Sequence, residues 1–560
     1  MDPEAPNVLH NISRRAHWSR ANEKGVFPGV ASPLNWSIWG EIGELAVRRG
    51  AFDLGLLDAA ELALPESVDD WGWSIFYGRP SANVDTWRVL YERGLGGMGQ
   101  GAATQRQVFG DAPAASVPAG AGSGAAAAAA SEARRRAIAE RRPAAIATSP
   151  ARLRATRAQA IAWWRAATRA VAEGSADAAM RCFREGLELF ERADRDHIVV
   201  SLLSTEAVTA LSTAAAAAGQ PDAANALMIG YPGMEEFETA VAVWDLSRER
   251  LSLEAFLDEH GFHGAREGEI ASRSWREDPA PVRALAARYA RLPDADDPRA
   301  RESRAVGERG RLEAALRAAI PASDRDALDQ ALSLAATCLP MREAGRATLT
   351  IALDGMRAAA RALAREFVRA GILTREDDVF FTTRSELLDP PADLRARVEL
   401  RRDLVASYER FELPESWQGM PGKLEPERRS ESPGAANGVV VGDRIDGLGA
   451  SAGVHEGVAR VVLDPSDPAL EFEAGDVLVA PATDPSWAPL FLVAGAVVID
   501  TGSNISHAAV VAREMGIPAV VAAREASLRL RSGQRLRVDG KAGTVEVVAD
   551  AVTDERVPQH

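Results

Sequence analysis

The feature that most constrains the fold is a sharp change of sequence pattern near residue 442. Residues from about 150 to 410 are rich in Ala, Leu, Arg and Glu, with apolar residues three and four positions apart. These are strong helix formers with the period of amphipathic helices. Beyond residue 442, short β-branched runs bounded by Gly, Asp or Pro replace that pattern. The sequence therefore predicts a multidomain α and α/β protein, with a large, mainly α-helical domain followed by a compact C-terminal β/α domain.

The C-terminal part is predicted to contain short strands around one clear helix. The helix covers residues 508–515 and stops at Gly516 and Pro518. Strands are expected at residues 458–463, 476–480, 496–500, 519–522, 535–538 and 544–548. A domain of roughly 110 residues is large enough to fold on its own.

Two stretches of biased composition divide the chain. Residues 111–145 are almost entirely Ala, Gly, Ser, Pro and Arg. We interpret them as a low-complexity insertion whose first half is flexible, while the Ala-rich part could become helical. Residues 414–442 have the Pro- and Gly-rich composition of a flexible linker. The predicted organisation is a mainly helical domain over residues 1–413, the linker over 414–442, a β/α domain over 443–550 and a tail over 551–560.

Charge and composition exclude several classes of partner. The 560 residues include 65 Lys and Arg against 80 Asp and Glu, giving a net charge of −15. Nucleic acids and anionic membranes are bound by basic surfaces, so neither is expected as a partner. The longest apolar run, residues 487–499, is shorter than the roughly 20 residues of a membrane helix. No basic and then apolar segment opens the chain, so no signal peptide is expected.

Cysteine and lysine are both scarce. Cys182 and Cys338 are too few for a disulfide framework or a cysteine metal site, which fits a reducing cytoplasm. We therefore expect a cytoplasmic protein without a metal site. Only Lys24, Lys423 and Lys541 are lysines, so few residues are available for lysine-dependent chemistry.

The segment TGSNISHAAVVAREMGIPAVV, residues 501–521, carries the predicted chemistry. A strand is expected to end at Asp500, a short polar turn follows, and Ser506 occupies the N-cap position of the next helix. His507 then lies near unpaired backbone N–H groups and the positive end of the helix dipole, which favour a bound anion. A neutral imidazole is also a competent nucleophile. This geometry suits a phosphohistidine; the alternative is that His507 is only a helix-start residue.

The segment resembles the swivelling phosphohistidine domain, or mobile domain, of phosphoenolpyruvate-utilising enzymes. Their signature is approximately Gly-Gly-x-Thr-Ser/Cys-His-Ala-Ala-Ile-Val-Ala-Arg-Glu-Leu-Gly-Ile-Pro-Ala-Val. Supporting blocks lie at residues 453–460, 475–479, 483–487, 538–540 and 543–545. Ser503 stands where the family often has its second Gly, and Ile505 replaces the Thr before Ser/Cys-His. Loss of that hydroxyl removes a possible phosphate hydrogen bond but leaves the nucleophile.

Blocks in the helical part resemble rifampicin-phosphotransferase-like proteins and occur in the same order. They cover residues 18–37, 261–279 and 342–381. The resemblance implies that residues 1–413 bind a substrate. Arg342 and Arg346 are four positions apart, so on a helix both project from one face and could stabilise a transferring phosphoryl group. The spacing alone would also fit a solvated helix face, and the resemblance favours the phosphoryl role.

Further candidate site residues come from the first two blocks. His263, followed by Glu267, could accept the proton of a substrate hydroxyl, or could be a structural histidine at a helix break. Asn22 and Glu23 are candidate polar groups of a substrate pocket. The aromatic residues of the first block could line such a pocket or simply belong to the core. They are Trp18, Trp36 and Trp39.

Most other histidines are predicted to have no part in catalysis. His197 lies in a charged helical stretch, and His10 and His560 lie near the chain termini, so each is expected at the solvated surface. His455 lies in a Gly-flanked segment of the β/α domain, where a role in a turn is expected.

Relatives that phosphorylate their own histidine from ATP carry an ATP-grasp domain with nucleotide-binding lysines. The blocks above include no such domain, and Gly422-Lys423 is no Walker A motif because Trp417 replaces its first Gly. We therefore expect a dikinase-like phosphotransferase subunit with no bound cofactor. A separate ATP-grasp subunit, holding ATP and Mg²⁺, would phosphorylate His507. The β/α domain would then swing on its linker and deliver the phosphoryl group to a small organic acceptor with a hydroxyl group.

This arrangement resembles the two-subunit phenylphosphate synthases. Two alternatives stay open, a non-catalytic phosphocarrier or regulatory binding protein and a degenerate homologue.

Overall fold

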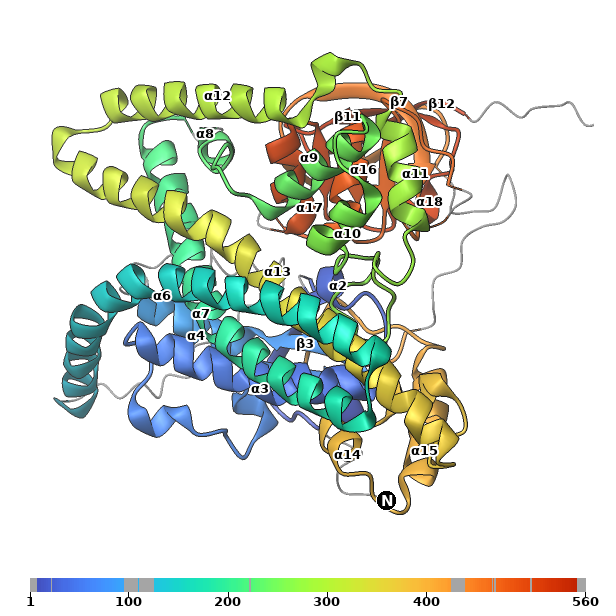
Figure 1. Ribbon diagram of the computed structural model, residues 1–560. Coiled ribbons are helices and arrows are strands. Elements are labelled where there is room, and N and C mark those ends of the chain that lie inside the picture. Colours follow the sequence, from blue (N-terminus) through green and yellow to red (C-terminus); the bar gives the residue numbers. More distant parts are fainter. Residues whose placement is uncertain are drawn as a thin grey trace, which may run out of the picture.

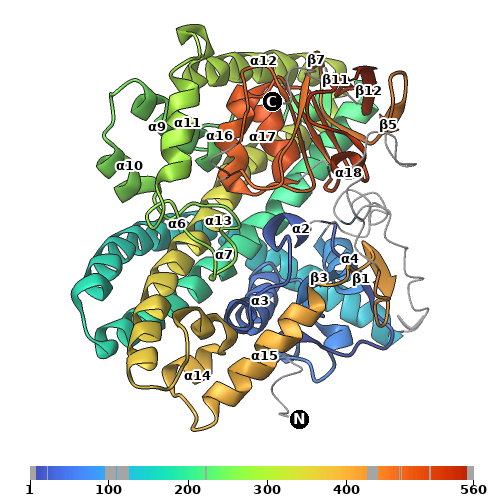
Figure 2. The same ribbon diagram turned by 90° about the vertical axis from the view of Figure 1, so that its right-hand side faces the viewer.

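The protein is described by a computed structural model, whose described residues are 8–21, 23–94, 109, 125–220, 223–424, 439–465, 467, 470–503 and 506–550. The predicted tail, 551–560, and residues 111–124 of the predicted insertion lie outside them. Figures 1 and 2 show a helical body with a second lobe above it. In that lobe the C-terminal domain sits beside a group of shorter helices.

Helices predominate in the first three quarters of the chain. They are α2 (Glu23–Val26), α3 (Pro33–Asp53), α4 (Val84–Gly94), α6 (Ala125–Glu173), α7 (Ala176–Ala217), α8 (Ala223–Ala226), α9 (Glu235–Ser247), α10 (Leu253–His260), α11 (Ala280–Tyr289), α12 (Pro298–Ala319), α13 (Arg325–Arg369), α14 (Arg384–Leu388) and α15 (Leu394–Tyr408). The C-terminal domain adds α16 (Ala488–Val493), α17 (His507–Met515) and α18 (Ala526–Arg529).

The body is built on three long helices, α6, α7 and α13, which pack along one another, with α3 against α7. Their apolar faces meet in one core that contains Phe183, Phe190 and Met356. This is the arrangement that their amphipathic period predicts. Helix α6 begins at Ala125, so the Ala-rich part of the predicted insertion is helical. Alanine has the highest helix propensity, which accounts for this outcome.

A buried polar cluster ties α13 to its neighbours. Asp354 is fully buried and accepts a hydrogen bond of 2.7 Å from the Trp164 indole N–H of α6. It also pairs with Arg357 at 2.7 Å and with Arg276 at 3.0 Å. The two guanidinium groups keep the Asp354 carboxyl ionised although burial opposes its charge, so its pKa lies below the ordinary value. Asp354 therefore links α6, α13 and the segment before α11.

A small antiparallel sheet corrects the predicted domain boundary. Its strand order is β2 (Trp73–Phe76), β3 (Arg79–Asn83), β1 (His17–Ser19) and β4 (Ser416–Gln418). Strand β4 comes from the predicted linker, 414–442, and pairs with β1 so that Trp417 is opposite Trp18. Trp417 is buried there against Phe76. The start of the predicted linker is thus folded onto the body. Local composition could not predict this, because the partner strand lies about 400 residues away in the sequence.

The C-terminal domain contains an eight-stranded sheet. The strand order is β5 (Arg444–Asp446), β12 (Thr544–Ala549), β11 (Arg535–Asp539), β7 (Val454–Val461), β8 (Val477–Ala480), β9 (Ala496–Ile499), β10 (Ala519–Val521) and β6 (Leu448–Ser451). Strands β7 to β10 run parallel, and the outer pairs are antiparallel. All six predicted strands and the predicted helix are present. Gly516 ends α17 in the left-handed conformation, with φ of 66°.

The C-terminal domain shares a hydrophobic core with α9, α10 and α11. Trp244, Phe256 and Tyr289 from these helices pack in one cluster with Trp487 and Phe491. The Tyr289 hydroxyl donates to the Pro489 carbonyl at 2.7 Å. Residues 1–413 are therefore divided between two lobes, whereas one domain was predicted. The helical period of a sequence shows that a helix has an apolar face, but it does not show which element packs against that face. Figure 2 shows α9 to α11 beside the red helices of the C-terminal domain.

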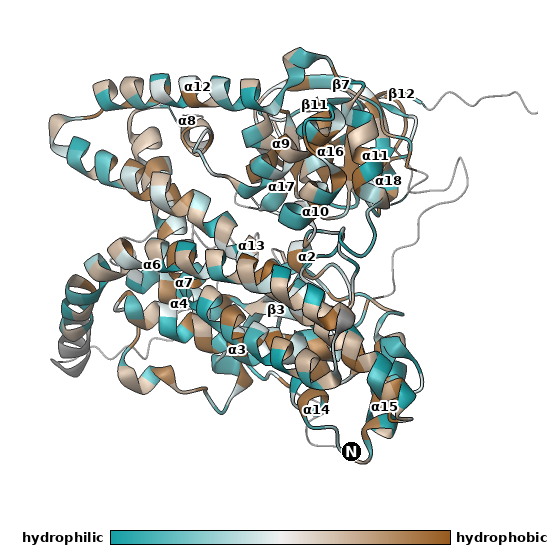
Figure 3. Cartoon of the chain, in the orientation of Figure 1, coloured by the Kyte–Doolittle hydropathy of each residue, from teal (hydrophilic) through white to brown (hydrophobic). Residues whose placement is uncertain are grey.

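Helix α7 is long and apolar enough to cross a membrane by length and composition alone. In the structure, however, 67% of its most apolar window is buried inside the protein, as in the core helix of a soluble protein. Helix α12 shows the opposite pattern. Figure 3 shows hydrophilic residues along its length, and few of its residues are buried.

Candidate active site

His507 is the first residue of α17, at the end of the turn that follows β9. Ser506 occupies the predicted N-cap position in an extended conformation, but its hydroxyl donates to the Ser503 carbonyl at 2.7 Å instead of capping the helix. Gly502 has φ of 113°, and a Cβ there would lie 2.8 Å from the Ser506 hydroxyl oxygen. The turn therefore requires Gly502 in order to place Ser506 and His507. Ile505 lies outside the described residues.

The His507 imidazole is neutral and has one unused nitrogen. Its Nδ1 lies 3.2 Å from the Thr483 hydroxyl. Its Nε2 is buried and has no hydrogen-bond partner among the described residues. Burial, followed by the nearby Arg346 charge, holds the pKa of His507 well below its ordinary value. When Nδ1 donates its proton to Thr483, the Nε2 lone pair is available as a nucleophile.

His507 lines a cavity of about 340 Å³ between the C-terminal domain and the body. Thr483, Asp484 and Ser506 line it from the same domain as His507. The opposite part of the lining is strongly aromatic and comes from the body. They form an aromatic wall of Phe27, Trp36, Trp39, Trp73, Trp87, Tyr91 and Phe109. An apolar cavity with a few polar groups at one end is the usual form of a small-molecule site.

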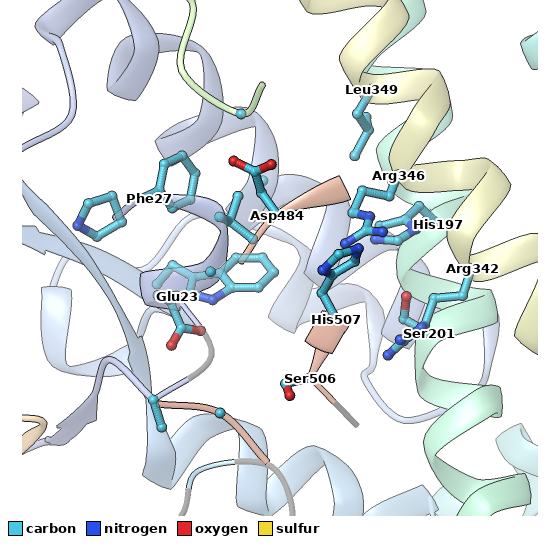
Figure 4. A pocket seen from close by; sticks show the side chains of 18 of the residues that line it. Glu23, Phe27, His197, Ser201, Arg342, Arg346, Leu349, Asp484, Ser506 and His507 are labelled. Atoms are coloured by element: carbon cyan, nitrogen blue, oxygen red, sulfur yellow. The ribbon is translucent and has the colours of Figure 1, made fainter. Parts of the chain in front are cut away.

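Arg342 and Arg346 both line this cavity, one turn apart on α13. Their guanidinium groups lie 2.7 Å from the two carboxylate oxygens of Glu343, and Arg346 also pairs with Glu236. Burial opposes the Glu343 charge, but Arg346 and Arg342 hold its pKa well below the usual range. Figure 4 shows both arginines on the side of the cavity that the His507 ring faces. Both arginines therefore face the cavity, and they do not form a solvated helix face.

A second glutamate, Glu236, lies beside Arg346. Burial, together with the Glu343 charge, raises the pKa of Glu236 to about 8. Burial likewise raises the pKa of Asp484 to about 7, with the nearby Glu267 charge as a second cause. The carboxyl groups around the arginines therefore do not all carry charge, and the local field stays favourable for an anion.

His263 does not have the character of a general base. Its Nδ1 lies 2.7 Å from Glu267, and Glu235 lies 3.8 Å from its Nε2. Burial alone would lower the pKa of His263, but Glu267 and Glu235 raise it to about 9. A histidine that already carries its proton at neutral pH cannot accept another from a hydroxyl. The predicted base role of His263 is therefore not supported, whereas its partner Glu267 lines the cavity.

Only some of the other residues predicted for the pocket line the cavity. Trp36 and Glu23 line the cavity, and so does Trp39. Trp18 is fully buried in the core of the small sheet instead. Asn22 lies outside the described residues.

One cluster has the composition of a metal site. The candidate ligand atoms of Glu235, His260 and His263 all lie within 4.8 Å of one another. Glu235 is also paired with Arg157 at 2.6 Å, and His263 with Glu267. These contacts are those of a protonated histidine held between carboxylates, so a metal ion would have to displace the His263 proton.

Several cavity residues on α7 were not predicted. His197, predicted at the surface, lines the cavity, and Asp194 lies one turn before it. Burial raises the pKa of Asp194 to about 8, which keeps its carboxyl group neutral at neutral pH. Ser201 continues the same stripe. Spacings of three and four among apolar residues place these side chains on the inner face of α7, and that spacing was the available signal.

Two known protein families match separate parts of this chain. Residues 472–543 match the family model for the mobile domain of PEP-utilising enzymes. Residues 249–343 match the model for the fourth domain of rifampicin phosphotransferase. The predicted resemblance to phosphotransferases of the phosphoenolpyruvate-utilising type is thereby confirmed.

Individual relatives agree with the family models. A rifampicin phosphotransferase of Streptomyces sviceus is 30% identical over 315 residues, which cover 54% of this chain and 34% of that protein. A rifampicin phosphotransferase of a Streptomyces species is 38% identical over 190 residues, 33% of this chain and 21% of the relative. The Bacillus subtilis rifampicin phosphotransferase is 34% identical over 187 residues, again 33% and 21%. The matched part is thus about a third of the relatives' length or less.

Proposed function

We propose that this protein is a phosphotransferase subunit in which His507 carries a phosphoryl group on Nε2 and passes it to a hydroxyl group of a small organic acceptor. One observation carries the proposal. A neutral histidine with a buried, unpartnered Nε2 lines the same cavity as two arginines and an aromatic wall. A phosphoryl group on Nε2 would supply the missing partner and would face both guanidinium groups.

The donor in this proposal is a separate ATP-grasp subunit, which would hold ATP and Mg²⁺. In the loading step ATP is split to AMP and phosphate. The β-phosphoryl group forms the N–P bond to His507, AMP leaves as the α–β P–O bond breaks, and the γ-phosphoryl group passes to water as the β–γ P–O bond breaks. His507 Nε2 is buried in the docked domain, so a donor cannot reach it there. The C-terminal domain therefore has to leave the cavity for loading and return for transfer. Such movements gate many multi-step enzymes.

The body supplies the acceptor site. The aromatic wall would hold the apolar part of the acceptor, while Arg342 and Arg346 would neutralise the charge of the transferring phosphoryl group. In the transfer step the new O–P bond forms, the N–P bond breaks, and its electron pair returns to His507. A shared cavity supplies the proximity that this step needs. The aromatic wall favours an enzyme over the alternative of a non-catalytic phosphocarrier, which needs no acceptor cavity.

The test of this function is phosphoryl labelling followed by discharge. The full chain is incubated with an ATP-grasp protein and ATP labelled at the β-phosphate, and acid-labile, base-stable label is measured on the chain. We expect label on wild-type protein and none on His507→Asn. Label that persists in His507→Asn would overturn the assignment of the carrier, and label that never leaves in the presence of hydroxyl compounds would favour the phosphocarrier.

A further inference from the structure

His197 and His507 face the same group of charges in the cavity. It lies on α7 and lines the cavity together with Arg342 and Arg346. The charges that act on His507 are Arg346, Glu343 and Arg342, and the same three act on His197. Figure 4 shows the His197 ring beside Arg346, with the His507 ring on the near side of that arginine. His197 is thus a cavity residue of the body.

The His197 ring packs against a glycine of α13. Gly345 lies in the interior of α13, between Arg342 and Arg346. A Cβ at Gly345 would lie 2.7 Å from His197 Nδ1 and 3.1 Å from His197 Cβ. Glycine inside a helix is less stabilising than alanine. Gly345 therefore makes α13 less stable, but it allows the His197 ring to lie close to the part of α13 that carries both arginines.

One nitrogen of the ring packs against α13. Nδ1 is buried beside Gly345, and the ring also interacts with the Arg342 main chain. The residue lines the cavity, and Nε2 is its other ring nitrogen.

We propose that His197 is a further catalytic residue, whose Nε2 accepts the proton of the acceptor hydroxyl as the phosphoryl group leaves His507. The proposal rests on the function proposed above. As the acceptor O–P bond forms, the O–H bond breaks and its electron pair stays on oxygen, while the proton moves to His197. The N–P bond breaks at the same time and returns its electron pair to His507. Atoms and charges balance without another reactant.

The charge of His197 fits this role in the loaded enzyme. Burial and the nearby Arg342 lower the pKa of His197 to about 4, so it is neutral and can accept a proton. A phosphoryl group between the arginines would offset their positive charge and raise the pKa of His197. His197 would therefore be a stronger base in the phosphorylated protein. His263 cannot replace it, because His263 is already protonated and does not line the cavity.

The test separates loading of His507 from discharge. The full chain is phosphorylated with potassium phosphoramidate, a small phosphoryl donor that needs no partner protein, and then freed of the donor. Loss of acid-labile label is followed in water and in water with phenol. We expect His197→Gln to load as wild type does and to discharge about 10²–10⁴-fold more slowly. Glu188→Gln, an exposed residue of the same helix, is the matched control.

Two further variants distinguish a proton acceptor from a structural residue. Imidazole added to loaded His197→Gly should restore discharge, which a purely structural role would not allow. Gly345→Ala should slow discharge by displacing the ring, whereas Gly310→Ala in exposed α12 should not, since a Cβ there meets nothing within 4 Å. Wild-type discharge rates in both His197 variants would overturn the proposal. A wild-type chain that takes no label on His507 would instead overturn the proposed function itself.

Discussion

Arg346 lies 2.7 Å from a carboxylate oxygen of Glu343, one turn earlier on the same helix. The second oxygen of Glu343 lies 2.7 Å from Arg342, so one buried carboxylate positions both guanidinium groups. The side chains are only partly exposed, to the cavity that contains His507. Preorganised positive charge of this kind stabilises a transition state because little reorganisation is needed during the reaction.

Replacing either arginine should therefore impair transfer more than loading. We expect Arg342→Gln and Arg346→Gln to lower the rate of discharge from phosphorylated His507 by about 10²–10³-fold. Arg346→Lys should recover part of the rate, because lysine keeps the charge but loses the planar fork. The exposed Arg365 on the same helix supplies the control, Arg365→Gln. Discharge rates equal to wild type in both Gln variants would contradict this role.

The buried ion cluster at Asp354 should dominate the stability of the body. Asp354→Ala leaves the fully buried Arg357 guanidinium without its carboxylate and removes the acceptor of the Trp164 N–H. We expect the free energy of unfolding to fall by about 3–5 kcal/mol, as for other broken buried pairs. Denaturant titration measures this change. A loss as small as that of Asp403→Asn, a substitution at an exposed site, would show that the cluster adds little.

Stability should fall as pH rises from about 6.5 to 8. Burial raises the pKa of Asp194 and of Glu236 to about 8, and Glu267 and Glu235 raise that of His263 to about 9 despite its burial. In this range the folded state holds protons that the unfolded state has released, so raising the pH favours unfolding. One such group contributes at most about 1.4 kcal/mol per pH unit.

Asp194→Asn isolates one of these groups. The amide mimics the neutral carboxyl but cannot ionise, so the decline of the thermal midpoint between pH 6.5 and 8 should become shallower. Asp403→Asn should leave the decline unchanged. An identical slope in wild type and Asp194→Asn would mean that Asp194 is ionised in the folded protein throughout this range.

Docking of the C-terminal domain should depend on Tyr289. Its buried hydroxyl, on α11, donates to the Pro489 carbonyl of the C-terminal domain. Tyr289→Phe removes that hydrogen bond, which costs about 0.5–1.5 kcal/mol. Looser docking should expose His507 Nε2 more often and speed its loading by phosphoramidate. Tyr231→Phe is the matched control, because the buried Tyr231 hydroxyl donates to the Leu227 carbonyl of its own segment. Equal loading rates in the two variants would contradict this view of docking.

The sequence predicts the C-terminal domain well because its signals are local. Each strand between β7 and β12 is a β-branched run between turn residues, and Gly516 marks the end of α17. Strands β5 and β6 are short and contain polar residues or Gly, so they lack that signal. Strand β4 depends on a partner at the opposite end of the chain, which no local pattern can show.

The site residues that belong to a sequence motif were predicted correctly as cavity residues. The properties of the residues whose environment depends on tertiary packing were not predicted. His507 and the two arginines lie in one cavity. His263 was predicted to be a possible general base, but two buried glutamates beside it favour its protonated form. The positions of these glutamates depend on the tertiary fold. His197 was expected in solvent because its sequence neighbours are charged. Its actual environment is the inner face of α7, against Gly345 of another helix.

The central claim is that His507 Nε2 carries the phosphoryl group, and ³¹P NMR of the phosphoramidate-treated full chain tests it most directly. We predict one phosphohistidine signal, with the phosphorus bonded to Nε2, that is absent from His507→Asn and present in His197→Gln. A wild-type spectrum without such a signal, or the same signal in His507→Asn, would contradict the account.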